Sequence, residues 1–394
     1  MEETQELQTI ANVIKQFYSI LIPQCITIEE FKVKGQLWIE NVKNEFKNDR
    51  ITVLIYDIFL QELFSFIGGK DKKHHALIMK GGGIKGLAYV GALEILGEHE
   101  KFDWYAGTSA GAISALLLAC GYNVEELKNI LSEKDFSQFK DAGWFKRIIN
   151  LATKHGLYES HTFLEWMDGL LAKKLGSTVA VKLKHLPSRV SIYASRRDLS
   201  ALIFDSSDQK SMELNAAFTA RCSISIPLFF TPQKSEGLNV FDGGMQNNFP
   251  VEILLKNNPK STFLGLYLGK EIYTRKKNNL FLDLLDIWTE SSDPEILEKH
   301  KENIIVIDTD PISLFDFKLT AFQKEFLLES GRLAAISYLQ KKSLADKNEF
   351  DFDNRKIVLE KNRQILKNKK RSKIKILTII FLMILVVIII NRSA

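Results

Sequence analysis

Residues 76–111 read ALIMKGGGIKGLAYVGALEILGEHEKFDWYAGTSAG, and this stretch decides the fold class. Two short apolar runs, at 76–79 and 102–106, predict buried strands. Each run is followed by a glycine-containing turn and then by a helical pattern, at 84–97 and at 110–120. Strand followed by helix, twice in succession, predicts a parallel sheet with helices on both faces. The expected class is therefore α/β, with three layers (α/β/α) and a mainly parallel central sheet.

The remainder of the chain continues the same alternation and adds a segment at each end. Further strands are predicted at 190–194, 201–204, 238–241, 262–268 and 304–307, and further helices at 281–290 and 321–341. Residues 347–375 are so strongly charged that they predict a solvated helix or stalk. The expected organisation is a helical N-terminal extension (1–73), an α/β domain (74–345), a charged stalk (346–373) and a transmembrane helix (374–391).

Composition excludes several classes of protein. The 394 residues are 45% apolar with only 8 Pro and 3 Cys, which excludes a disordered chain or a small disulfide scaffold. Residues 1–366 carry 46 bases and 48 acids, and a body this close to neutral gives no reason to expect nucleic acid as a partner, since that affinity rests on a basic surface. The three cysteines are isolated and no calcium loop or metal-ligand cluster stands out, so we expect no cofactor and no metal.

The apolar run at 376–390 predicts a membrane anchor. It contains no charge, and 15 residues of helix at ~1.5 Å each are just long enough for a thin bilayer when flanking bases reach the headgroups. Six bases precede the run closely and one follows, which predicts a single-pass anchor with the body of the protein on the cytoplasmic side. The first residues lack the pattern of a signal peptide, in agreement with this orientation. The alternative is a terminal helix buried within the protein.

The first glycine-rich turn, Gly81 to Gly86, allows three interpretations. It satisfies GxGxxG between a strand and a helix, which is typical of dinucleotide sites. Backbone N–H groups that no side chain covers can equally hold the oxyanion of an acyl-transfer reaction. The third interpretation is an ordinary tight turn.

The second turn, Gly107-Thr108-Ser109-Ala110-Gly111, has the GxSxG pattern of a nucleophile elbow. In that motif the serine lies on a sharp strand-to-helix turn, and the positive end of the helix dipole faces the reacting centre. The alternative is a turn whose small residues only allow close helix packing. Two such turns about 20 residues apart favour the catalytic interpretation.

A serine nucleophile needs a general base. The seven histidines, at 74, 75, 99, 155, 161, 185 and 300, lie in no recognisable turn motif. Asp242 follows the apolar run 238–241 and precedes Gly243-Gly244, which places a carboxylate at the end of a predicted strand. An Asp-Gly pair is also common in ordinary turns, so this signal alone leaves both interpretations open.

The three motifs together resemble the patatin-like phospholipases, in which a glycine-rich turn, a GxSxG elbow and a DGG or DGA turn occur in this order. Residues 220–227 and 247–250 resemble the stretches that flank the aspartate in that family. The resemblance covers about 76–341. Lys85 stands where many members have arginine, and Cys222 where a smaller residue is common.

The resemblance implies a carboxylic ester hydrolase that acts on phospholipids or other acyl lipids and takes membrane lipids as substrate and anchor. Ser109 would be the nucleophile and Asp242 the proton acceptor, without a histidine between them. The oxyanion hole would be formed by the backbone of Gly81, Gly82, Gly83, Ile84, Lys85 and Gly86, with Gly107, Gly111, Gly243 and Gly244 as motif residues. We expect burial to raise the pKa of Asp242, since an ordinary carboxylate is a weak base for an alcohol.

Three alternatives remain open from the sequence. One is an α/β-hydrolase with a Ser109, Asp242 and His300 triad, whose chain order is usual for that fold. Another is a nucleotide-binding membrane protein that uses Gly81 to Gly86, with Asp103 as the ribose acceptor. The last is a membrane tether without catalytic activity.

Overall fold

A computed structural model of the protein describes residues 74–97, 99–199, 201–270, 293–314, 316–344 and 350–370, together with Lys34, Leu37, Trp38, Glu40, Asn41 and Asn44. The chain divides into two compact units, Met1–Lys73 and His74–Ala394, and the six described residues of the first unit are helical. The predicted helix at 281–290 and the predicted span at 374–391 lie outside the described residues. Among the residues that the structure describes, no helix is both long and apolar enough to cross a membrane.

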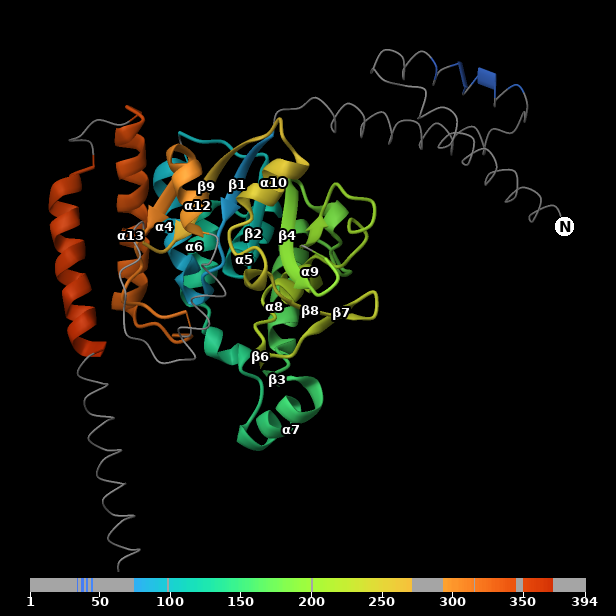
Figure 1. The fold of residues 1–394 in the computed structure, drawn as a ribbon, viewed down its shortest axis with the longest axis horizontal. Coiled ribbons are helices and arrows are strands. Elements are labelled where there is room, and N and C mark those ends of the chain that lie inside the picture. Colours follow the sequence, from blue (N-terminus) through green and yellow to red (C-terminus); the bar gives the residue numbers. More distant parts are fainter. Residues whose placement is uncertain are drawn as a thin grey trace, which may run out of the picture. The chain divides into compact units, whose positions relative to one another are not determined.

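The second unit is built on an eight-stranded sheet with the order β10-β9-β1-β2-β4-β8-β7, in which β5 pairs with β4 (Figure 1). The strands from β10 to β4 are parallel neighbours, whereas β5, β7 and β8 are antiparallel additions, so the predicted mainly parallel sheet is confirmed. A separate parallel pair joins β3 to β6. The strands are β1 His75–Met79, β2 Trp104–Thr108, β3 Gly156–Tyr158, β4 Arg189–Arg196, β5 Leu202–Asp205, β6 Leu228–Phe230, β7 Gln233–Ser235, β8 Leu238–Asp242, β9 Thr262–Leu268 and β10 Ile304–Ile307.

Helices and short 3-10 turns connect the strands. The helices are α4 Leu87–Leu96, α5 Ala110–Ala119, α6 Val124–Glu133, α7 Trp144–Lys154, α8 His161–Leu175, α9 Ala216–Ser223, α10 Val251–Asn257, α12 Asp293–Lys299, α13 Ala321–Lys341 and a last helix at 352–370. The 3-10 turns are Gly83–Gly86, Phe136–Phe139, Leu183–His185, Gly243–Met245 and Lys301–Asn303. The predicted elements at 262–268 and 321–341 coincide with β9 and α13, whereas the strand predicted at 102–106 begins two residues later.

The sheet is covered on both faces, as the apolar runs predict. Leu77 and Met79 of β1 point into a large core that includes side chains of α4, α5 and α13. Ala76 and Ile78, which alternate with them, point into a second core formed with α10 and α12. Because successive side chains of a strand point to opposite faces, a strand buried on both sides must be apolar throughout. This arrangement gives the three layers.

The charged segment near the C-terminal end of the described chain differs from the prediction. Residues 352–370 form a helix beside α13 (Figure 1) and are not a stalk free in solvent. Leu359 and Leu366 belong to the large core, and Arg363 forms an ion pair of 3.1 Å with Asp308. Arg355, Arg363 and Lys367 have acidic partners in earlier parts of the chain, which charge content alone does not reveal.

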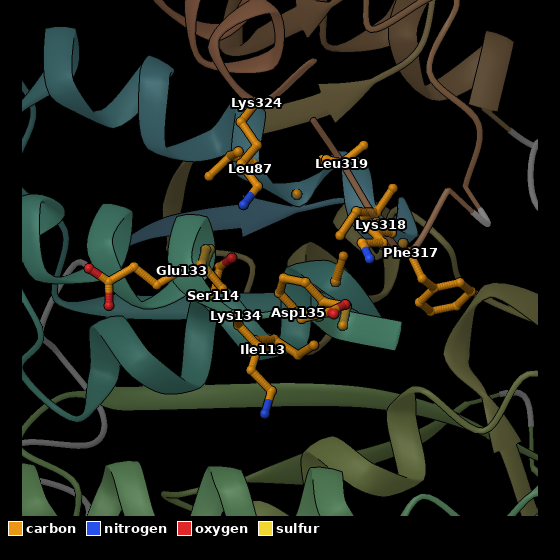
Figure 2. A pocket seen from close by; sticks show the side chains of 16 residues that line it. Leu87, Ile113, Ser114, Glu133, Lys134, Asp135, Phe317, Lys318, Leu319 and Lys324 are labelled. Atoms are coloured by element: carbon orange, nitrogen blue, oxygen red, sulfur yellow. The ribbon is translucent and has the colours of Figure 1, made fainter. Parts of the chain in front are cut away.

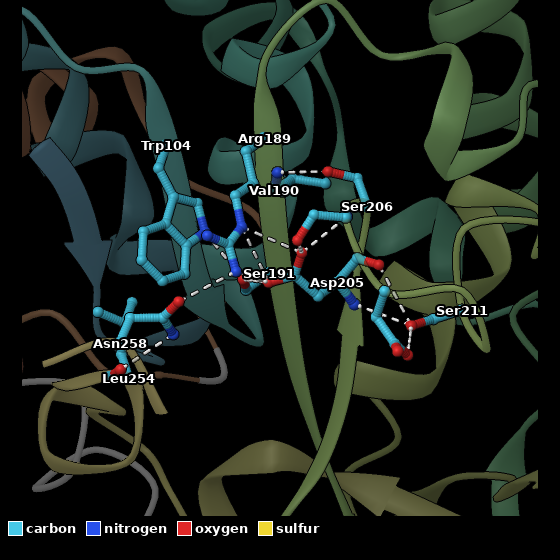
Figure 3. A network of polar contacts seen from close by, with 11 residues as sticks. Trp104, Arg189, Val190, Ser191, Asp205, Ser206, Ser211, Leu254 and Asn258 are labelled. Carbon is cyan, nitrogen blue, oxygen red and sulfur yellow. Dashed lines mark hydrogen bonds and ion pairs between the residues drawn. The ribbon is translucent and has the colours of Figure 1, made fainter. Parts of the chain in front are cut away.

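A buried polar network joins β2, β4 and β5 (Figure 3). The Asp205 carboxylate accepts hydrogen bonds from the guanidinium of Arg189, with 3.1 Å between Nε and Oδ1, and from the Ser191 hydroxyl at 2.5 Å. Trp104 donates its indole N–H to Ser191, and the Arg189 guanidinium lies over the Trp104 ring. Burial by itself would raise the pKa of Asp205, but the charge and hydrogen bonds of Arg189 outweigh it and lower the pKa.

Replacing this carboxylate tests the network. Asp205→Asn should reduce the free energy of unfolding by about 2 to 4 kcal/mol at pH 7, because Arg189 loses its charged partner in a partly buried site. Since the pKa of Asp205 is lowered, the contribution is complete at neutral pH and is lost as the pH falls through the folded-state pKa. Urea unfolding should therefore show a difference from wild type that narrows only below about pH 4.

The exposed Asp353→Asn is the matched control and should change stability by less than about 0.5 kcal/mol. Equal effects of the two substitutions would show that the network does not stabilise the fold.

Candidate active site

The GxSxG motif forms a sharp elbow between β2 and α5. Ser109 has φ 52° and ψ −116°, a conformation that non-glycine residues rarely adopt. A β-carbon on Gly107 would lie 2.4 Å from the backbone of Gly111, and one on Gly111 would lie 2.1 Å from the carbonyl oxygen of Met79. Both glycines are therefore required by close backbone approach, and together they hold the Ser109 hydroxyl at the C-terminal end of the strand.

Asp242 lies at the same level of the sheet as Ser109. Thr108, which precedes the serine, is in register with Tyr193 of β4, and the next residue of β4, Ala194, is in register with Asp242 of β8. β8 is antiparallel and two strands away from β2, so its last residue reaches this edge from the opposite direction. Both predicted catalytic residues are 7% exposed and line one pocket.

The two oxygens of the Asp242 carboxylate differ in their surroundings. Oδ1 accepts the N–H of Gly244 at 2.7 Å, whereas Oδ2 is buried and has no aligned hydrogen-bond partner among the described residues. Burial raises the pKa of Asp242 to about 6, an effect that the Gly244 N–H and the nearby Ser109 hydroxyl partly offset. The expected rise is confirmed. A carboxylate with a pKa near neutrality and one unoccupied oxygen can accept a proton.

The first glycine-rich turn lies beside the serine. A β-carbon on Gly81 would be 2.1 Å from the Asn248 amide oxygen and 3.4 Å from the Ser109 β-carbon, so a side chain here would enter the site. The Gly81 N–H is already bonded to the carbonyl of Asn248, which removes it from the predicted set of oxyanion donors.

Two further N–H groups of this turn already donate hydrogen bonds within the protein. The N–H groups of Ile84 and Lys85 donate to the carbonyl oxygens of Leu314 and Gly82. The N–H groups of Gly82 and Gly83 have no acceptor within the described part of the chain. Of the five residues from Gly81 to Lys85, only these two therefore keep an available N–H group, and Gly86 closes the 3-10 turn Gly83–Gly86.

Residues 221–225 support the backbone of both predicted catalytic residues, a role that the sequence did not predict. The Ser223 hydroxyl accepts the N–H of Ser109 at 2.8 Å and donates to the carbonyl of Tyr193 at 2.6 Å. The carbonyl of Ser225 accepts the N–H of Asp242 at 2.9 Å, and the Ser225 hydroxyl is held by the buried guanidinium of Arg221. The signal available in the sequence was the run of small residues at 220–227, which points to close packing but not to these bonds.

The main pocket, defined by the residues around Ser109 and Asp242, encloses about 120 Å³ and is largely apolar. Its apolar lining consists of Ile84, Ala110, Ile113, Phe136, Phe139, Phe163, Ile224, Ile226, Pro227, Phe230, Met245, Leu268, Leu314 and Phe317. Lys80 also lines it, but its buried ammonium lies 4.0 Å from the centre of the Tyr267 ring. The pocket therefore offers a polar floor at Ser109 and apolar walls.

A side cavity of about 160 Å³ adjoins the main pocket and shares Ile84, Ile113, Phe136 and Phe317 with it (Figure 2). Its further lining comes from the end of α6, the start of α13 and the segment between 317 and 319. The buried Ser114 hydroxyl lines it and has no hydrogen-bond partner among the described residues.

The triad alternative does not fit this geometry. His300 precedes β10, lies edge-on to Phe263 with 5.4 Å between ring centres, and bonds Glu252 at 2.8 Å. Phe263 is near the N-terminal end of β9, whereas Leu268, at the other end of that strand, lines the main pocket. His300 is therefore at the opposite edge of the sheet from Ser109. All seven histidines are described, and none lines the main pocket.

The nucleotide alternative is contradicted in the same way. Asp103 precedes β2, where its carboxylate binds the His74 imidazole at 3.0 Å and the His75 N–H at 2.9 Å. These residues are at the N-terminal end of β1, whereas the turn Gly81 to Gly86 follows its C-terminal end. Asp103 cannot reach a ribose whose phosphates bind that turn.

The raised pKa of Asp242 predicts an effect on stability. Asp242→Asn should increase the free energy of unfolding by about 1 to 3 kcal/mol at pH 8, because wild type must keep a charge that burial disfavours. Between the pKa of Asp242 in the unfolded chain and its folded-state pKa of about 6, the folded state binds one more proton than the unfolded state. Wild-type stability therefore falls as the pH rises through this window. Thermal unfolding from pH 4 to 8 should show the advantage of the variant growing with pH. A variant that is less stable than wild type at pH 8 would contradict the assignment.

One protein family and several known proteins are similar to this chain. Residues 77–255 match the family described as patatin-like phospholipase. Protein YqhO of Bacillus subtilis is 30% identical over 286 residues, which cover 67% of this chain and 97% of YqhO. The probable lipid hydrolase 463L of invertebrate iridescent virus 6 is 24% identical over 210 residues, which cover 48% of this chain and 67% of that protein. VipD from Legionella pneumophila, a solved structure, aligns with a TM-score of 0.46 and 16% identity over 76% of this chain and 77% of VipD. The chain belongs to the patatin-like phospholipase family.

Proposed function

We propose that this protein is a carboxylic ester hydrolase that cleaves acyl esters of phospholipids or other lipids, with Ser109 as nucleophile and Asp242 as general base. One observation carries the proposal. A serine on a strained elbow and a buried carboxylate with an unoccupied oxygen share the floor of an apolar pocket. The family assignment supports a lipid hydrolase independently of this geometry.

The reaction would proceed in two steps. Asp242 Oδ2 accepts the hydroxyl proton of Ser109 while Oγ bonds to the carbonyl carbon of the ester, and the carbonyl oxygen becomes an oxyanion. The N–H groups of Gly82 and Gly83 would stabilise this charge, and each such donor is typically worth about 3 kcal/mol. The C–O bond then breaks, and the leaving alkoxide takes the proton from Asp242. Water, deprotonated by the same carboxylate, then bonds to the acyl carbon, the bond to Ser109 Oγ breaks to release the fatty acid, and Oγ regains the proton from Asp242.

The pocket supports a lipid substrate. Its walls are aromatic and aliphatic, and an acyl chain that enters them leaves water, which is favourable by roughly 0.8 kcal/mol per buried methylene. The relative 463L carries the name of a probable lipid hydrolase, in agreement with this substrate class. We further propose that the apolar run at 376–390 anchors the enzyme in a membrane with the catalytic unit on the cytoplasmic side, where substrate is locally concentrated.

Covalent labelling tests the nucleophile. A fluorophosphonate probe should label the full-length protein in detergent, and Ser109→Ala should abolish labelling. Asp242→Asn should slow labelling by about 100-fold or more, because the hydroxyl loses its base. Ser114→Ala, which changes a buried serine of the side cavity, is the control and should leave the rate unchanged. Labelling that persists in Ser109→Ala would exclude Ser109 as the nucleophile.

The pH dependence of hydrolysis tests the base. With a soluble short-chain ester, kcat/KM should rise with pH and level off above an apparent pKa of about 6, because only ionised Asp242 accepts a proton. An ordinary histidine titrates in the same range, so the profile alone does not distinguish the two bases. His300→Asn should therefore retain both the rate and the profile. A loss of several hundredfold with the fold intact would contradict direct proton transfer to Asp242.

A further inference from the structure

The helix α7 presents its apolar face to solvent. Its residues Trp144, Phe145, Ile148, Ile149 and Leu151 are between 41% and 70% exposed. At 100° per residue these five side chains lie on one side of the helix. A surface helix of a globular protein normally turns such a face toward the core, so α7 is inverted with respect to the usual arrangement.

Polar contacts hold α7 in this inverted orientation. Asn150, on the opposite side of the helix, is 2% exposed and donates its amide to the carbonyl of Leu157 at 3.3 Å. Arg147 donates to the Tyr158 hydroxyl at 3.5 Å, with its guanidinium 5.9 Å from the centre of that ring. The polar side is therefore the docked side, and the five apolar side chains leave a large part of their surface exposed.

The segments that flank α7 connect it to the lining of the main pocket. α7 leads directly into β3, which pairs with β6 so that Gly156 is in register with Leu228 (Figure 1). Leu228 is itself 57% exposed, and its neighbours Pro227 and Phe230 line the pocket. On its other side, α7 follows the turn Phe136–Phe139, whose two phenylalanines also line the pocket.

The charges on α7 match a negatively charged surface. The helix carries three bases, Lys146, Arg147 and Lys154, and no acid. Lys146 and Lys154 form ion pairs with Glu159 just beyond the helix, and both remain about half exposed at its border. Bases that flank a face of Trp, Phe, Ile and Leu are typical of helices that lie in the interface of a bilayer.

We propose that α7 is a membrane-docking helix that inserts its apolar face between the headgroups and acyl chains of a phospholipid bilayer containing anionic lipid. Leu228 extends the inserted surface to the rim of the main pocket. Docking in this way would turn the entrance toward the lipids, so that an acyl chain passes into the pocket without crossing water. The purpose of this docking rests on the proposed function, whereas the insertion itself does not.

A local probe tests insertion in the full chain, independently of any other membrane contact. An environment-sensitive NBD fluorophore is attached at Ile148→Cys in a Cys25→Ser background, since Cys120 and Cys222 are buried. Vesicles of phosphatidylcholine with phosphatidylglycerol should shift its emission to the blue, and lipids brominated on the acyl chain should quench it. The control is Ile357→Cys, which is 67% exposed on the helix 352–370 and should show neither change. No shift at 148, or equal shifts at both positions, would overturn the proposal.

Hydrolysis provides a second readout. The double variant Trp144→Ser with Phe145→Ser should lose about tenfold or more of its activity on vesicle phospholipid and none on a soluble short-chain ester. An unchanged rate on vesicles would overturn the proposal. If wild type hydrolyses neither substrate, the proposed function fails, yet the fluorophore at 148 still reports insertion.

A second copy of this chain is the competing occupant of the face. A blue shift at 148 that appears without vesicles, as protein concentration rises, would identify the apolar face as a contact between copies and would overturn membrane docking. If the face docks on membranes and not on a second copy, sedimentation without vesicles should give the same mass for wild type and for the double variant.

Discussion

The site depends on a close approach of three backbone segments where β1 and β2 end. No side-chain carbon fits between Gly107 and Gly111, or between Gly111 and the carbonyl of Met79. α5 therefore starts directly behind Ser109, and the strained backbone of that serine is imposed by the packing around it. The strain is sustained because β1 and β2 pair in the middle of the sheet and α5 is buried against them. The glycine-rich turn that follows β1 is brought beside the hydroxyl as a consequence.

The buried Asp242 carboxylate lowers the stability of the fold. A buried charge with one unpaired oxygen is unfavourable, and a protein selected for stability alone would place a neutral group there. The surrounding structure keeps this unfavourable carboxylate in place. The carbonyl of Ser225 accepts the backbone N–H of Asp242, and the hydroxyl of Ser223 accepts that of Ser109. Arg221, itself buried, fixes the segment that contains both serines. The same burial that destabilises the fold raises the pKa toward the range in which a carboxylate is an effective base.

Two amphipathic helices of this chain have opposite relations to the fold. In the helix 352–370, Leu359 and Leu366 face the core, while Arg363 pairs with Asp308. In α7, Asn150 faces the protein and the apolar side chains face solvent. The sequence pattern of each helix gives the direction of its apolar face, but not what covers it. Only the neighbours in the fold decide this, because the covering groups come from distant parts of the chain.

The sequence by itself determined the class of fold and the two turns between β1 and α5. Both follow from local physics, since an apolar strand, a turn that excludes side chains and a helix are encoded within a few residues of each other. The tertiary structure decided that Asp242, at the end of an antiparallel strand two places away, lines the same pocket as Ser109, and that His300 and Asp103 lie at the other edge of the sheet. It also decided which amides of the first turn remain available and how Ser223 and Ser225 brace the site. These features depend on strand order, register and burial. The contacts that create them join residues far apart in the sequence, so no local sequence pattern reveals them.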